Sequence, residues 1–220
     1  MKALDLSYVK ICGITRQEDA ALACNLNVSA IGFVTFPKSK RYISSLDVKE
    51  ITSQIIDKYP KIKRVGVFVN ENFDTLISYL KSGINVIQLH GDETVEYVCN
   101  LKKAVLTENI DAEIWRAGRL RDREDILLLN EYSVDKYLVD SFVDDEVGGT
   151  GVVGDWNLAE YAVNLLPKPV ILAGGLTSKN IHKALEEVHP FGVDVSSGVE
   201  VSPGIKDHSL MKEFIGMLNL

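Results

Sequence analysis

Two side chains that could move protons stand at the ends of short apolar runs in this sequence. Cys12 closes a run that also contains Lys10, and Asp140 closes another. A thiolate can accept a proton and a carboxylic acid can donate one, so the pair suits general acid–base catalysis. Lys10 and a nearby helix start would favour the thiolate. Taken singly, a strand cysteine is more often a small core residue, and an aspartate after a strand is often a turn residue.

Two late segments have the composition of a phosphate site. Gly174 and Gly175 follow one apolar run, and Ser196, Ser197 and Gly198 follow the next. Glycines let backbone N–H groups approach an anion closely, and a helix N-terminus adds a favourable dipole. A glycine pair alone is usually only a turn. Two such loops after consecutive strands favour a phosphate site, because (β/α)₈ barrels commonly bind phosphate after strands seven and eight.

A basic loop could hold another part of an anionic ligand. Arg41 lies in segment 37–42, which is locally basic in an acidic protein. A guanidinium can bind a carboxylate with two hydrogen bonds, although an ordinary solvated loop would have the same composition. Segment 148–151, glycine-rich and downstream of Asp140, could close over a bound ligand.

These residues need a scaffold that brings distant segments together. Apolar, β-branched runs predict strands at 9–12, 30–35, 64–69, 85–89, 113–117, 136–139, 170–173 and 192–195. Helical periodicity predicts helices at 16–27, 47–58, 72–82, 94–103, 123–130, 156–166, 179–188 and 208–218. Eight or so alternations without a linker predict an α/β fold, a single (β/α)₈ TIM barrel over residues 1–220. Such enzymes keep their active sites at the C-terminal ends of the strands.

Side-chain alternation makes closure of this barrel testable. Residues two apart on a strand share a face, so Lys10 lies on the face of Cys12, and Asp194 on that of Ser196. Their apolar neighbours pack outward, which places the polar groups inside the barrel. A buried lysine or aspartate is costly unless it is paired. The first and last strands are neighbours only in a closed barrel, so we predict contact between Lys10 and Asp194.

Composition narrows the function classes. A net charge of −7 argues against duplex nucleic acid as a partner, since phosphate binding usually needs a basic face. The first residues lack a signal-peptide pattern, and no window approaches the roughly 18 apolar residues of a membrane span. Three cysteines without metal-like spacing fit a reducing cytoplasm. We expect a cytoplasmic protein with a small phosphorylated ligand and no membrane partner; the sequence leaves open whether it is a monomer or a homodimer.

The short motifs that contain these polar residues, taken in order, resemble those of the phosphoribosylanthranilate isomerase family of tryptophan biosynthesis. They occupy residues 9–15, 32–34, 37–42, 65–70, 88–91, 139–141, 148–151, 155–156, 192–200, 203–204 and 206–207. The motifs at 9–15 and 192–200 are the most specific for this family. The resemblance implies a (β/α)₈ enzyme without cofactor or metal. It also implies an Amadori rearrangement that converts N-(5-phosphoribosyl)anthranilate to 1-(2-carboxyphenylamino)-1-deoxyribulose 5-phosphate.

The resemblance also implies roles for individual residues. Cys12 is the general base that removes the proton from ribose C2′, and Asp140 is the general acid that protonates the ring oxygen as the ring opens. Arg41 holds the anthranilate carboxylate. The phosphate is held by the loops of Gly174, Gly175, Ser196, Ser197 and Gly198.

The surroundings of the reacting ribose are assigned less fully. Asp194 and His90 border the sugar or the anthranilate amine, by the same resemblance. The phosphate and carboxylate of such a substrate disfavour a thiolate at Cys12, since the reference pKa of cysteine is about 8.5. We expect Lys10 and the start of the first helix to offset that penalty. Arg116, on the fifth predicted strand, matches no motif and has no assigned role.

Other functions compete with the isomerase. A ribulose-phosphate epimerase needs metal-ligating histidines at strand ends, whereas His182, His189 and His208 fall on or near predicted helices. An indole-glycerol-phosphate synthase needs a lysine and a glutamate at strand ends and leaves Cys12 unexplained. A barrel that only binds a phosphorylated metabolite, as a sensor or scaffold, needs neither Cys12 nor Asp140. We therefore favour the isomerase.

Overall fold

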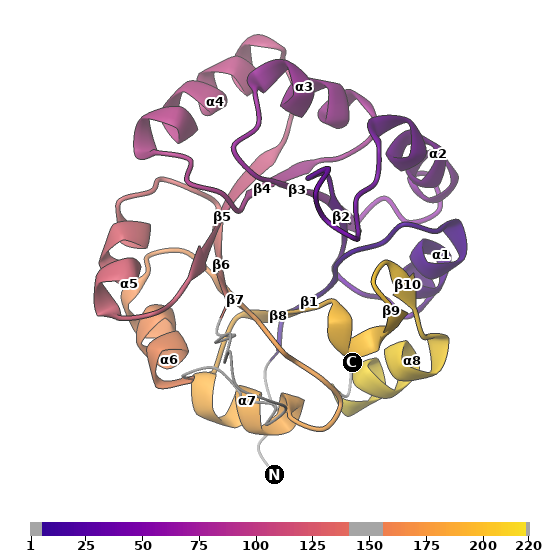
Figure 1. Cartoon of the computed structure of the whole chain (residues 1–220), viewed down its shortest axis with the longest axis vertical. Coiled ribbons are helices and arrows are strands. Elements are labelled where there is room, and N and C mark those ends of the chain that lie inside the picture. Colours follow the sequence, from indigo (N-terminus) through magenta and orange to yellow (C-terminus); the bar gives the residue numbers. More distant parts are fainter. Residues whose placement is uncertain (1–5, 141–155, 219–220) are drawn as a thin grey trace.

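The chain closes into a parallel barrel surrounded by helices (Figure 1). This computed structural model describes residues 6–140 and 156–218. The strands are β1 (Tyr8–Ile11), β2 (Ala30–Val34), β3 (Lys63–Phe68), β4 (Val86–Leu89), β5 (Glu113–Arg119), β6 (Lys136–Asp140), β7 (Val170–Ala173) and β8 (Gly192–Val195). Because β8 pairs with β1 in parallel, the sheet is closed, and the predicted (β/α)₈ TIM barrel is confirmed.

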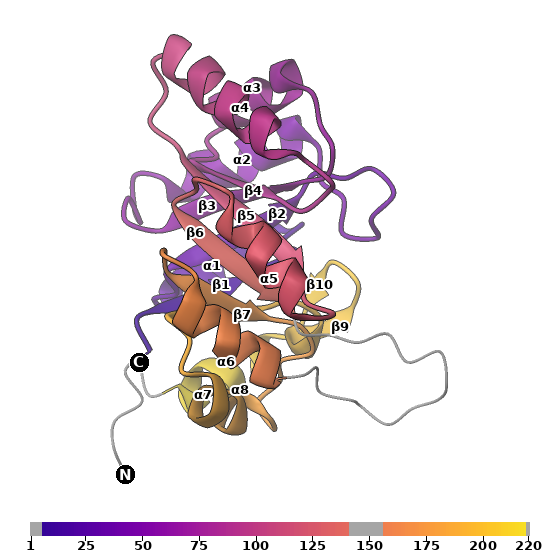
Figure 2. The same ribbon diagram turned by 90° about the vertical axis from the view of Figure 1, so that its left-hand side faces the viewer.

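The helices lie outside the barrel, between successive strands. They are α1 (Gln17–Asn25), α2 (Ser45–Ile55), α3 (Phe73–Lys81), α4 (Val95–Thr107), α5 (Arg123–Asn130), α6 (Trp156–Leu165), α7 (Ile181–Val188) and α8 (His208–Met217). Seen from the side, α3 and α4 lie at one end of the long axis and α7 and α8 at the other (Figure 2). Within the described ranges no helix is long and apolar enough to cross a membrane.

Polar side chains fix where many of the helices begin. Ser44, Asn72, Thr94, Asp122 and Asp207 accept backbone N–H groups at the starts of α2, α3, α4, α5 and α8. Such caps satisfy donors that the first turn leaves unpaired. The strands and helices otherwise begin and end within a few residues of the predicted bounds. The largest difference is α4, which runs on to Thr107 because its buried apolar stripe continues to Val105.

The two faces of the sheet belong to separate apolar cores. Outward side chains such as Ile11, Phe33 and Ile87 pack against the helices in the larger core. Inward side chains form a smaller core inside the barrel: Ala30, Val65, Val86, Trp115, Ala117, Leu138, Ile171 and Ala173. This division follows from the two-residue period of a strand. The inner core fills the middle of the barrel and leaves polar side chains at both ends.

The N-terminal end of the barrel contains a charged cluster around Glu113. Its carboxylate lies 2.7 Å from the Nζ atoms of both Lys63 and Lys136 and accepts a hydrogen bond of 2.8 Å from the Trp115 indole. Burial alone would raise the pKa of Glu113, but these donors lower it to about 2. The cluster ties β3, β5 and β6 together at the end opposite the strand C-termini.

The segment after β8 departs from a plain barrel. The strand β8 is followed by the short 3₁₀ helix η1 (Ser197–Val199). It is followed by a hairpin of β9 (Glu200–Ser202) and β10 (Ile205–Lys206), which the sequence did not predict because both strands are too short to show periodicity. The hairpin lies beside α1 and α8 (Figure 1).

Candidate active site

A cavity of about 400 Å³ opens at the C-terminal ends of the barrel strands, here called the barrel mouth. The predicted site residues that line it are Cys12, Arg41, His90, Asp140, Gly174, Gly175, Asp194, Ser196 and Ser197. Gly198 lies behind this wall, packed so tightly that a Cβ there would come within 1.9 Å of the Leu176 carbonyl oxygen. The structure therefore brings the predicted residues together, from segments spread over most of the chain.

The predicted contact between the first and last strands is confirmed. Lys10 and Asp194 are register partners across β1 and β8, and Lys10 Nζ lies 2.8 Å from Asp194 Oδ2. Both are buried, at 0% and 9% exposure. Burial disfavours the Lys10 ammonium, but the Asp194 carboxylate and the Cys12 thiol together raise the pKa of Lys10. Among the described residues, Asp194 Oδ1 has no hydrogen-bond partner, so this oxygen remains available to a ligand in the cavity.

Cys12 follows β1 directly and lies in a tightly packed position. Its backbone N–H donates to the Val195 carbonyl at 2.8 Å, which extends the β1–β8 pairing by one residue. Gly32 on β2 faces the thiol, where a Cβ would lie 2.7 Å from Cys12 Sγ and 3.0 Å from Lys10 Cε. The thiol and the ammonium therefore share space that only a glycine at position 32 leaves open.

The resting Cys12 thiol is neutral. Burial raises its pKa and is the largest effect, while Lys10 and Lys206 lower the pKa and Asp194 raises it further. The expected offset by Lys10 is present but does not outweigh burial. The first helix, α1, begins at Gln17, five residues after Cys12, and the expected help from its N-terminus stays a prediction. Formation of a thiolate at Cys12 is therefore opposed by burial and favoured by the two lysines.

Asp140 reaches the cavity from the far side of the ring. It ends β6, where its register partners are Arg119 on β5 and Ala173 on β7, and it is half-buried. Two strands, β7 and β8, lie between β6 and β1 (Figure 1). A thiol and a carboxyl group so placed can act on different atoms of one ligand between them.

His90 and Gln88 present polar groups from β4 and the loop after it. Solvent reaches the His90 ring, yet protein surrounds most of it, and this desolvation lowers its pKa; Asp140 opposes the shift and Lys10 adds to it. The ring is therefore neutral at neutral pH. Gln88 was not among the predicted site residues, but it lines the cavity, and its buried Oε1 has no partner among the described residues. The sequence signal that could have identified Gln88 as a site residue is its place two residues before His90, on the same face of the strand.

Arg41 is held by a partner that the sequence did not reveal. Its Nε lies 2.9 Å from Glu200 Oε1 and its Nη2 lies 2.7 Å from Glu200 Oε2, while Lys206 Nζ lies 2.8 Å from Glu200 Oε1. Glu200 and Lys206 are 4% and 0% exposed. Arg41 lines the cavity and Glu200 does not. One edge of the guanidinium is thus occupied by the protein, and the edge that carries Nη1 and Nη2 remains for a ligand.

The loop after β7 has the backbone geometry of an anion-binding turn. Gly174 and Gly175 have φ angles of 95° and 62°, a region that favours glycine. Asn180 stands at the start of α7. Its Oδ1 accepts the Thr177 N–H at 2.8 Å, and its Nδ2 donates to the Gly175 carbonyl at 2.9 Å. The segment at 148–151, expected to close over ligand, lies outside the described residues.

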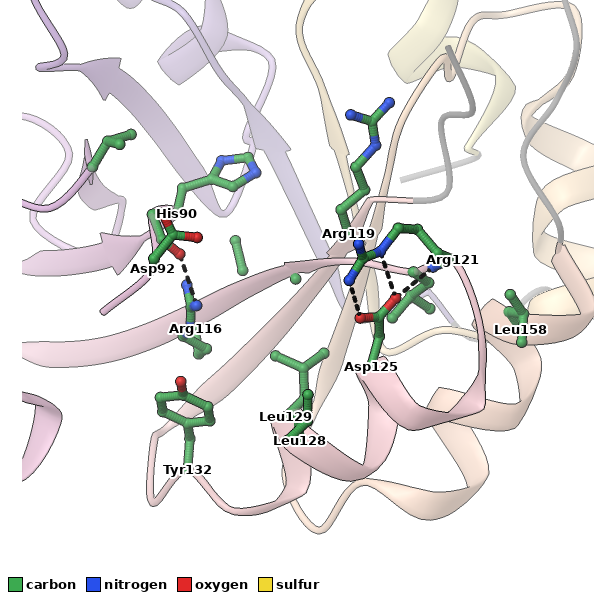
Figure 3. A pocket seen from close by; sticks show the side chains of 15 residues that line it. His90, Asp92, Arg116, Arg119, Arg121, Asp125, Leu128, Leu129, Tyr132 and Leu158 are labelled. Atoms are coloured by element: carbon green, nitrogen blue, oxygen red, sulfur yellow. Dashed lines mark hydrogen bonds and ion pairs between the residues drawn. The ribbon is translucent and has the colours of Figure 1, made fainter. Parts of the chain in front are cut away.

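A larger recess, of about 1080 Å³, lies over the outer face of β5 (Figure 3). It shares Val69 and His90 with the smaller cavity but is lined by neither Cys12 nor Asp140. Arg116 and Arg121 line it, the latter paired with Asp125 at 2.7 Å. Cys12 and Asp140, the predicted acid–base pair, therefore both line the smaller cavity. Across residues 6–140 and 156–218, no group of three or more His, Cys, Asp or Glu side chains could hold a metal ion.

Comparisons with known proteins point to one family. Residues 9–217 match the family profile of N-(5'-phosphoribosyl)anthranilate (PRA) isomerase. The N-(5'-phosphoribosyl)anthranilate isomerase of Acetivibrio thermocellus is 40% identical over 213 residues, which cover 96% of this chain and 94% of that protein. The structure of phosphoribosyl anthranilate isomerase from Thermotoga maritima has a TM-score of 0.83 at 36% identity and covers 97% of this chain and 99% of its own. A structure of the isomerase in complex with reduced 1-(o-carboxyphenylamino)-1-deoxyribulose 5-phosphate has a TM-score of 0.80 at 35% identity, with the same coverage.

Proposed function

Because the chain belongs to the N-(5'-phosphoribosyl)anthranilate isomerase family of tryptophan biosynthesis, we propose that Cys12 is the general base of its reaction and Asp140 the general acid. The isomerase converts N-(5-phosphoribosyl)anthranilate to 1-(2-carboxyphenylamino)-1-deoxyribulose 5-phosphate. The observation that carries the proposal is that these two side chains line the same cavity from separated strands. Family membership decides against the epimerase, the synthase and the binding-only barrel.

The reaction opens the ribose ring first. Asp140 donates its proton to the ring oxygen, the C1′–O bond breaks, and the anthranilate nitrogen lone pair forms a C1′=N iminium bond. The phosphate and carboxylate of the substrate favour the protonated, neutral form of a nearby acid. The half-buried position of Asp140 at the barrel mouth is compatible with this role.

Proton removal from C2′ follows. The Cys12 thiolate takes this proton, the C–H electrons form a C1′=C2′ bond, and the iminium electrons return to nitrogen. The resulting enolamine takes a proton at C1′ and loses one from its C2′ hydroxyl, which yields the amino-ketose. Lys10 and Lys206 lower the pKa of the thiol against the effect of burial, so they stabilise the thiolate when it forms.

Ligand binding is assigned to the remaining lining residues. Arg41 holds the anthranilate carboxylate through its Nη1–Nη2 edge, since Glu200 occupies the other edge. The buried Ser196 Oγ donates to the phosphate, and the buried Asp194 Oδ1 accepts a hydrogen bond from the sugar or the amine; neither atom has a partner among the described residues. His90 borders the sugar or the amine. The phosphate is surrounded by the loops of Gly174, Gly175, Ser196, Ser197 and Gly198.

We also infer that the enzyme works in the cytoplasm on a small phosphorylated substrate. Its three cysteines, Cys12, Cys24 and Cys99, are free thiols. Free thiols persist in reducing compartments.

The test is turnover of freshly generated phosphoribosylanthranilate, followed by the loss of its fluorescence. We expect Cys12→Ala and Asp140→Asn each to lower kcat by about 10²–10⁴, the usual contribution of a positioned acid or base. Both variants should still bind the reduced product analogue. The control is Cys99→Ala, which removes an exposed thiol and should leave turnover unchanged. Turnover that survives Cys12→Ala or Asp140→Asn would reassign that role.

A further inference from the structure

We propose that Arg116 is a positioning residue that fixes His90 in the barrel mouth. Arg116 Nη1 donates to the Leu89 carbonyl at 3.1 Å, and Nη2 donates to the Gly91 carbonyl at 2.8 Å. These two carbonyls flank His90 in the chain. One guanidinium therefore holds the backbone on both sides of the histidine. The inference rests on the proposed function, because His90 is assigned there to the sugar or amine of the substrate.

The position of Arg116 explains why it can make both bonds. It is the register partner of Leu89 across β4 and β5, and it lies on the outward face of β5. Arginine carries its N–H donors in a rigid planar fork, so two acceptors at the right separation fix its orientation. With 8% exposure, Arg116 is withdrawn from solvent, which would otherwise compete for these donors.

A second layer of contacts holds the guanidinium itself. Glu93 Oε2 lies 3.3 Å from Arg116 Nη1 and accepts the Gly91 N–H at 2.9 Å, while Glu93 Oε1 accepts the Asn70 N–H at 2.8 Å. The Tyr132 ring lies 5.1 Å from the guanidinium carbon, and its hydroxyl donates to the Glu93 carbonyl at 2.8 Å. The charge of Arg116 is thus paired, and the loop is tied to the loops after β3 and α5.

Two consequences for His90 can be separated. The first is placement: because the backbone is fixed on both sides, the ring has a defined direction into the cavity. Substrate binding and reaction rate both depend on such orientation of the groups in the site. The second is charge. The groups that act on the ring are Asp140 and Asp194, which favour the imidazolium, and Lys10 and Arg116, which disfavour it and add to the effect of desolvation in lowering the pKa of His90.

Two substitutions distinguish placement from charge. Arg116→Lys keeps the positive charge but offers one donor centre in place of the fork. Arg116→Gln removes the charge as well. We expect kcat/KM to fall about tenfold or more in both, and the His90 pKa, measured by NMR, to rise only in Arg116→Gln. The protein has four histidines, so the His90 signals can be assigned with His90→Asn. Arg121→Gln, in the same recess but exposed, is the control and should change neither quantity.

A double-mutant cycle shows whether Arg116 acts through His90. In the His90→Asn background, Arg116→Lys should lower kcat/KM no further, because the group that it positions is gone. An equal loss in both backgrounds would overturn the proposal, as would His90 NMR signals that stay unchanged in Arg116→Lys. Full activity of His90→Asn would instead contradict the proposed role of His90. Shifted His90 NMR signals in Arg116→Lys would then still support the positioning of His90 by Arg116. Arg116→Lys decides the matter if Arg116→Gln does not fold.

Discussion

Lys10 and Asp194 face each other across the strands that close the barrel, as register partners on β1 and β8 with 2.8 Å between Nζ and Oδ2. The pair is buried next to Cys12, and the ammonium lowers the pKa of that thiol. The Lys10 charge therefore has two effects: it compensates a buried carboxylate where the barrel closes, and it favours the thiolate of Cys12, the proposed base.

Removal of the Lys10 charge should weaken the base. In Lys10→Met we expect the pKa of Cys12 to rise further, because only Lys206 then opposes burial and Asp194. Turnover should fall in parallel. Loss of one partner also leaves Asp194 buried without its counter-charge, which typically costs about 3–5 kcal/mol of unfolding free energy. The thiol pKa can be measured from the pH dependence of alkylation in a Cys24→Ala, Cys99→Ala background, which leaves one reactive cysteine.

Lys10→Arg keeps a positive charge but places a larger side chain in the tight space beside Gly32, so we expect it to lower turnover as well. If Lys10→Met leaves both the Cys12 pKa and the turnover of folded protein unchanged, the role given to the Lys10 charge is wrong.

Gly32 should be essential for the position of the thiol. A Cβ at this residue would lie 2.7 Å from Cys12 Sγ and 3.1 Å from Cys12 Cα, so Gly32→Ala must displace the base. A misplacement of about 1 Å can cost on the order of 100-fold in rate, and we expect a kcat loss of that order with binding of the product analogue largely kept. Steady-state turnover and equilibrium binding measure the two effects.

The matched control is Gly216→Ala. A Cβ at Gly216 meets nothing within 4 Å, and the residue lies within α8, so alanine there should raise stability by about 0.5–1 kcal/mol without changing turnover. Unaltered kcat in Gly32→Ala would mean that the thiol does not need this space.

Glu200 should be required for the orientation of Arg41. In Glu200→Gln, Arg41 and Lys206 lose the carboxylate between them and repel each other, so the guanidinium leaves its fixed position. We expect KM to rise about tenfold with a smaller change in kcat, since a charge-assisted hydrogen bond contributes about 1.5–3 kcal/mol. An analogue without the carboxylate should show no such rise. Glu187→Gln, in an exposed pair with Lys183, is the control.

The sequence predicted what depends on strand order and side-chain alternation. The contact of Lys10 with Asp194 follows from closure alone, because the two-residue period turns both side chains inward on neighbouring strands. The pairing of Arg41 with Glu200 does not follow, because it crosses 159 positions and depends on a hairpin of two very short strands. The two hydrogen bonds from Arg116 to the backbone beside His90 could not be predicted from the sequence either. Their acceptors are backbone carbonyls, which every residue has, so no side-chain type marks them.

Stability at low pH should depend on Glu113. Its pKa is about 2 in the folded protein and 4.5 in its ordinary state, so between these values the unfolded chain binds more protons. The stabilisation is therefore complete above pH 4.5 and is lost as the pH falls toward 2. The shift corresponds to an upper limit of about 3 kcal/mol, and with a quarter of the side chain exposed we expect about 2 kcal/mol.

Urea unfolding of the wild type and Glu113→Gln across this pH range measures that contribution. The variant should be less stable at pH 7, because Lys63 and Lys136 lose the carboxylate between them, and the difference should shrink steadily as the pH falls below 4.5. Glu108→Gln, in an exposed pair with Lys81, should differ from the wild type by less than about 1 kcal/mol at every pH. A wild-type advantage over Glu113→Gln that stays constant with pH would show that packing, rather than the charge of Glu113, holds this end of the barrel together.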